Sequence, residues 1–72
     1  MYPNLEAEMA RSEVNKRDLA DCLSVRYATV IDKMKGRYDF TLTEAFKIQQ
    51  KFFPHCSIEY LFARKDNYQN TA

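Results

Sequence analysis

The chain has 72 residues, which is enough for one small domain and too few for a second hydrophobic core. A hydrophobic content of 46% argues against disorder, while a single glycine and two prolines leave little material for the turns of a multistranded β fold. We therefore expect an all-α domain. The net charge of +1 does not by itself indicate a nucleic-acid partner.

The first two predicted helices each follow an N-capping residue. Asn4 is the expected N-cap of the first helix, and Leu5 and Met9, four residues apart, form its apolar stripe. Asn15 is the expected N-cap of the second helix, and Asp18, three residues later, completes a shortened capping box. Three apolar residues have the spacing of a buried face on this second helix: Leu19, Ala20 and Leu23.

A tight turn separates the second helix from the third. The segment Ser24-Val25-Arg26 interrupts the helical pattern, and Val25 is its inward-facing residue. The third helix is predicted over about residues 27–34 and ends at Gly36, where a left-handed backbone costs little. Three residues mark its buried side: Val30, Ile31 and Met34.

Two further helices are predicted before a polar tail. Thr41 or Thr43 caps the fourth helix, and Pro54 ends it. Its expected apolar face consists of Leu42, Ala45, Phe46, Ile48, Phe52 and Phe53. Ser57 caps a short fifth helix whose inward-facing residues are Ile58, Leu61 and Phe62. We expect one domain over residues 1–63 and a C-terminal tail over residues 64–72.

Charge is unevenly distributed along the chain. Residues 4–24 contain three basic and five acidic side chains, a local charge of −2, whereas residues 26–37 contain four basic and one acidic side chain, a local charge of +3. A nearly neutral chain with one basic segment is compatible with a DNA-binding face. The alternative is a set of ordinary solvated charges, and charge alone does not decide between the two.

The spacing of these five helices resembles the phage-repressor and Cro-type helix-turn-helix family, also called XRE-like. Ala20 matches the small residue at the crossing of two helices, Val25 the buried turn residue, Val30 a core residue of the recognition helix, and Gly36 the glycine that ends it. LTEAFKI and CSIEYLF resemble the fourth and fifth helices of the family. The resemblance covers roughly residues 4–63 and is closest to small proteins of phages and mobile elements of Gram-positive bacteria. It implies a compact five-helix, lambda-repressor-like fold.

Three positions depart from the family pattern. Ser24 stands where the family most often has glycine, and Lys16 replaces the usual glutamine at the start of the second helix. The stretch KFFPHC is longer than the common connection before the fifth helix. These differences leave the expected fold unchanged but prevent a prediction of the target sequence.

In this family, the second helix of the motif lies in the major groove of DNA. The resemblance therefore implies base contacts from five residues: Arg26, Tyr27, Ala28, Thr29 and Asp32. It implies phosphate contacts from four basic residues: Lys16, Lys33, Lys35 and Arg37. The implied function is sequence-specific binding of double-stranded DNA by a homodimeric, repressor-like transcriptional regulator of a phage or mobile element. The alternative is a protein-interaction module with the same fold, such as an antitoxin, anti-repressor or adaptor.

Five aromatic residues are candidates for the dimer surface: Phe52, Phe53, Tyr60, Phe62 and Tyr68. The sequence favours the alternative, that most of these rings fill a small core. His55-Cys56 together with Cys22 lacks the paired spacing of a metal site, so we expect no metal. No glycine-rich phosphate loop is present, and we predict neither an enzyme nor a cofactor or small-molecule ligand. Because no apolar run reaches the ~20 residues of a membrane span and no signal peptide is visible, we expect a cytoplasmic protein.

Overall fold

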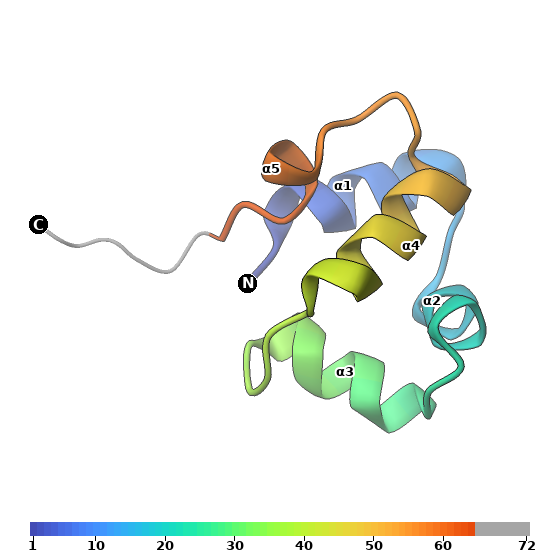
Figure 1. Ribbon diagram of the computed structural model, residues 1–72, viewed down its shortest axis with the longest axis vertical. Coiled ribbons are helices and arrows are strands. Elements are labelled where there is room, and N and C mark those ends of the chain that lie inside the picture. The colour runs from blue at the N-terminus through green and yellow to red at the C-terminus, as the bar shows by residue number, and fades with distance from the viewer. Residues whose placement is uncertain (65–72) are drawn as a thin grey trace, which may run out of the picture.

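The computed structural model describes residues 1–64, and this part of the chain is all-helical, with no β-strand (Figure 1). Its helices are α1 (Pro3–Ser12), α2 (Lys16–Leu23), α3 (Tyr27–Lys35), α4 (Leu42–Phe52) and α5 (Ile58–Leu61). The predicted all-α class and the order of the five helices are confirmed. All but the first residue of the predicted tail lies outside the described residues. None of the helices in residues 1–64 is both long and apolar enough to span a membrane.

The helices enclose one core to which each of them contributes. α2 packs against α3 and α4, and α5 packs against α1 and α4 (Figure 1). The largest fully buried side chains come one from each helix and one from the residue after α4: Leu5, Leu19, Val30, Ile48, Leu61 and Phe53. Burying a side chain of this size stabilises the fold by about 1.5–3 kcal/mol. The periodic apolar residues of the sequence therefore do form one core.

Three of the predicted helix caps are present. The Asn15 side chain accepts from the Asp18 N–H and the Asp18 carboxylate accepts from the Asn15 N–H, both at 2.9 Å. Thr41 forms the same reciprocal box with Glu44, at 3.1 and 2.9 Å, so Thr41 and not Thr43 caps α4. The Ser57 hydroxyl accepts from the backbone of α5. Each such cap satisfies N–H groups that a helix leaves unpaired.

The predicted start of α1 was wrong. The helix begins at Pro3, with Tyr2 and not Asn4 in the N-cap position. Proline suits the first helical position because its φ angle is already helical and its missing N–H is not needed there. Asn4 lies two residues after the N-cap, and its side chain instead donates to the Tyr60 carbonyl oxygen at 2.9 Å, which connects α1 to α5.

The apolar face of α4 is narrower than predicted. Ala45 and Ile48 are buried, but Leu42 is 68% and Phe46 is 48% exposed. In a helix, residues four apart share a side, and the side that carries Leu42 and Phe46 is rotated away from the Ala45–Ile48 side. Both residues were expected in the core and lie at the surface instead.

The aromatic candidates for the dimer surface have different environments: Phe53 lies in the core, Phe52 and Phe62 are partly buried, and Tyr60 is 39% exposed. Phe53 is fully buried, so its predicted role in a dimer surface is wrong. Phe62 packs edge-on against Tyr2 and Phe40, with ring centroids 6.0 and 5.3 Å away. Tyr68 lies outside the described residues. The interpretation that the rings fill a small core is therefore confirmed for Phe53 and Phe62.

Candidate nucleic-acid interface

The turn between α2 and α3 changes the direction of the chain within three residues (Figure 1). Ser24 ends α2 in a left-handed conformation, with φ 57° and ψ 44°. The Ser24 and Val25 N–H groups donate to the Asp21 and Ala20 carbonyl oxygens at 3.3 and 3.0 Å. Arg26 is extended, and α3 begins at the next residue. The predicted tight turn is thus present, and it accepts a serine where glycine is sterically easier.

The outer side of α3 presents a line of three residues to solvent. Ala28, Asp32 and Lys35 are spaced at four and three residues and so share one side of the helix. Val30 and Met34, on the opposite side, are 0% and 4% exposed. Thr29, which is half-buried, flanks this line. We call Ala28, Asp32 and Lys35, with Thr29 beside them, the outer face of α3.

Two predicted contact residues lie where α3 begins. Arg26 is exposed, and within residues 1–64 its side chain has no hydrogen bond or ion pair. Tyr27 is 46% exposed, and the Arg17 guanidinium from α2 lies 5.3 Å from its ring centroid. This contact brings the first turn of α2 next to the first turn of α3. Arg17 was missed by the sequence reasoning, although the Lys16-Arg17 pair at the start of α2 was a visible signal.

The predicted phosphate-binding residues have different surroundings. Lys16 at the start of α2 and Lys35 at the end of α3 have no ion pair within the described part of the chain. Arg37 Nε lies 3.9 Å from the Asp32 carboxylate, and the Arg37 side chain is 72% exposed, so this pair is weak. Within this part of the chain, Lys16 and Lys35 are therefore unpaired, and Arg37 is only weakly paired.

Lys33, in contrast, forms an ion pair with Glu44 and is largely buried. Its ammonium nitrogen lies 2.6 Å from the Glu44 carboxylate and 3.4 Å from the Asp39 carbonyl oxygen, and its side chain is only 12% exposed. Burial raises the pKa of Glu44, but hydrogen bonds from Lys33 and from the Thr41 N–H outweigh it and bring that pKa below its ordinary value. The pair therefore joins α3 to α4, in contrast to the other basic residues of the 26–37 segment.

The dimensions of α3 fit a groove. Its nine residues make it about 13 Å long, which is similar to the ~12 Å width of the major groove of B-DNA. Arg26 precedes its first turn and Lys35 stands in its last, so unpaired cations lie at both ends of the outer face. Lys16 and Arg17 add positive charge from α2.

No protein-family model, no curated protein and no solved structure matches the chain.

Proposed function

We propose that this chain is a helix-turn-helix protein that binds double-stranded DNA in a sequence-specific manner, with α3 in the major groove. The observation that carries the proposal is the outer face of α3, which is open to solvent, is held on α2 by a three-residue turn and has an unpaired cation at each end. A short helix supported in this way can enter the major groove.

The proposed contact residues fall into two groups, those that contact bases and those that contact phosphates. Arg26 has the donors to bind guanine O6 and N7, Ala28 allows close approach to a thymine methyl group, and Asp32 can accept from cytosine N4. Tyr27 and Thr29 contribute hydroxyl groups to a base or to the backbone. The phosphate contacts come from Lys16, Arg17, Lys35 and Arg37. Lys33 is left out, because its ammonium is already bound by Glu44.

A single domain of this size buries too little DNA to bind tightly alone, so we propose a homodimer on a palindromic site. The resemblance to XRE-like proteins supports a repressor-like regulator of a phage or mobile element that acts in the cytoplasm. Under this proposal, residues 1–63 form the helix-turn-helix domain.

The test is a selection of bound duplexes from a random DNA library at two salt concentrations. We expect one enriched motif whose retention falls at the higher salt. Replacement of Arg26 and Tyr27 by alanine should abolish or relax the motif. Lys51→Ala is the control, because Lys51 lies in the last turn of α4, at the end away from α3 (Figure 1). The proposal fails if no motif is enriched and no duplex is retained in a salt-dependent way.

One observation favours protein interaction, which the proposed homodimer also requires. Leu42 and Phe46 form an exposed apolar pair on α4, and Leu42 lines a surface groove of about 380 Å³ together with Phe40 and Phe62. We propose this face as the contact with a second copy of the chain. Replacing Leu42 and Phe46 by serine should then convert a dimer into a monomer in sedimentation experiments. A monomer before any substitution, with a motif still enriched, would refute the dimer surface and leave DNA binding in place.

A further inference from the structure

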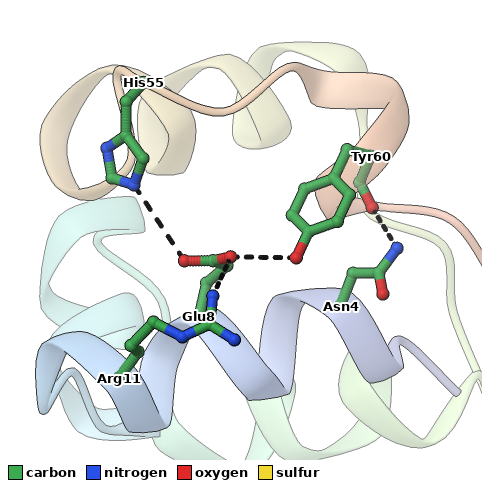
Figure 2. Close-up of polar contacts among 5 residues, drawn as sticks. All are labelled: Asn4, Glu8, Arg11, His55 and Tyr60. Carbon is green, nitrogen blue, oxygen red and sulfur yellow. Dashed lines mark hydrogen bonds and ion pairs between the residues drawn. The ribbon is translucent and has the colours of Figure 1, made fainter.

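Three side chains of types that can bind metal ions meet on the side of the molecule formed by α1 and the segment between α4 and α5. They are Glu8 of α1 and the adjacent residues His55 and Cys56 of that segment (Figure 2 shows Glu8 and His55). One ligand atom from each, a carboxylate oxygen, an imidazole nitrogen and the thiol sulfur, lies within 4.8 Å of the other two. Glu8 Oε1 and His55 Nε2 are 4.0 Å apart. Residues far apart in the sequence thus supply three different donor atoms at one place.

Glu8 is held so that one carboxylate oxygen faces the other two ligands. Its side chain is only 8% exposed, and Oε2 accepts from Arg11 Nη1 at 2.6 Å and from the Tyr60 hydroxyl at 2.9 Å (Figure 2). Within residues 1–64, Oε1 has no hydrogen bond, and its ion-pair partner His55 lies beyond hydrogen-bonding distance. A buried carboxylate oxygen without a donor is costly, unless a cation reaches it. Fixing one oxygen of a carboxylate by hydrogen bonds is also how proteins orient metal ligands.

We propose that Glu8, His55 and Cys56 bind one Zn²⁺ ion. Carboxylate, imidazole and thiolate are the three ligand types of zinc sites, whereas Mg²⁺ and Ca²⁺ prefer oxygen ligands alone. With bonds of about 2.0–2.3 Å, the ligand atoms of a tetrahedral site are roughly 3.3–3.8 Å apart. The three atoms must therefore approach one another by about 1 Å. His55, whose side chain is 65% exposed, has the freedom to make this movement.

The remaining features of the site follow from the ligand set. Cys56 binds as the thiolate, so its proton passes to solvent when the metal binds. A water molecule completes the tetrahedral coordination. Cys22 takes no part, since its sulfur contacts the Lys47 carbonyl oxygen at 3.8 Å on another side of the core. The bound ion joins α1 to the segment before α5 and so stabilises the folded state.

The experiment is a titration of the fully reduced 72-residue chain with Co²⁺, followed by Zn²⁺. We expect one equivalent of Co²⁺ to give the visible absorption of a tetrahedral site and a near-ultraviolet thiolate-to-cobalt band. Zn²⁺ should abolish both, because it binds such ligands more tightly than Co²⁺ does. Zn²⁺ alone should raise the Tm of the chain.

The variants assign the ligands. Cys56→Ser should lose the thiolate band, whereas Cys22→Ser, the matched control, should keep it. His55→Asn and Glu8→Gln should retain the band but weaken Co²⁺ binding by at least ~10-fold. His55 is largely exposed and Cys56 is half-buried, so we expect variants of these two residues to fold. They test metal binding even if Glu8→Gln fails to fold. The proposal is overturned if the wild-type chain gives no thiolate band, if Cys56→Ser keeps it, or if Cys22→Ser loses it equally.

Discussion

Lys33 and Lys35 lie two residues apart on α3, yet the structure assigns them opposite roles. Lys33 is 12% exposed and bound to Glu44, whereas Lys35 is exposed and has no ion pair within residues 1–64. Only a cation that neutralises a DNA phosphate releases a counterion on binding. We therefore expect Lys35→Ala to flatten the salt dependence of DNA binding and Lys33→Ala to leave it unchanged.

The magnitude follows from the number of cations proposed to contact phosphates. These four, Lys16, Arg17, Lys35 and Arg37, give a slope of log K against log salt of about −3.6, or a roughly 150-fold loss of affinity between about 50 and 200 mM salt. Without Lys35 the slope becomes about −2.7, and the loss falls to roughly 40-fold. Lys33→Ala should instead lower the free energy of unfolding by roughly 1–3 kcal/mol, because it leaves the half-buried Glu44 carboxylate without its cation.

The assay is fluorescence anisotropy of a labelled duplex at four salt concentrations, with urea unfolding of each variant alongside. Lys51→Ala, on the last turn of α4, is the control for a lost charge outside the proposed interface. If Lys33→Ala flattens the slope as much as Lys35→Ala does, Lys33 leaves Glu44 to bind DNA and the assignment is refuted. If neither changes the slope, the outer face of α3 does not meet phosphates.

Three further predictions concern stability. Ser24→Gly should raise the free energy of unfolding by up to ~1 kcal/mol, since relief of the left-handed strain at φ 57° exceeds the entropy cost of glycine. Gly36→Ala should lower it by about 1 kcal/mol or more in the same urea assay, because φ is +90°, a left-handed conformation that residues with a Cβ rarely adopt. Because folding lowers the pKa of Glu44, its ionised carboxylate stabilises the fold at pH values above the ordinary glutamate pKa of ~4.3. This stabilisation is lost as the pH falls through the lower pKa of Glu44 in the folded state. Glu44→Gln should therefore remove part of the acid dependence of unfolding; an unchanged pH profile would contradict the reasoning.

Local sequence signals predicted most of the fold. Asn15 with Asp18, Thr41 with Glu44, and Ser57 locate three helix starts, because a cap and the helix that it begins are close together in the sequence. The start of α1 was misplaced for a local reason too, since the preference of proline for the first helical position outweighed that of asparagine for the cap. Boundaries of this kind depend on competing preferences of similar size.

Contacts between segments that are distant in the sequence could not be predicted from it. The position of Lys33 in the sequence does not indicate that it pairs with Glu44, which lies on another helix. Likewise, the sequence does not indicate that Glu8 lies near His55 and Cys56; only the packing of α1 against α5 and the segment before it brings them together. The exposure of Leu42 and Phe46 also depends on which side of α4 its neighbours cover. Such facts require the arrangement of the helices in space.

The N-cap of α3 is in keeping with the proposed contact between Arg26 and DNA. Helices α2, α4 and α5 each have a side-chain cap, whereas α1 and α3 have none; α1 begins with a proline, and α3 has Arg26 in the N-cap position. Ser, Thr, Asp or Asn there would add about 1 kcal/mol, and a cation at a helix N-terminus also opposes the helix dipole. A small domain has little stability to lose. An unfavourable residue of this kind is expected where a binding requirement outweighs the local folding preference, and an exposed guanidinium at the first turn of α3 is well placed to meet a base edge or a phosphate.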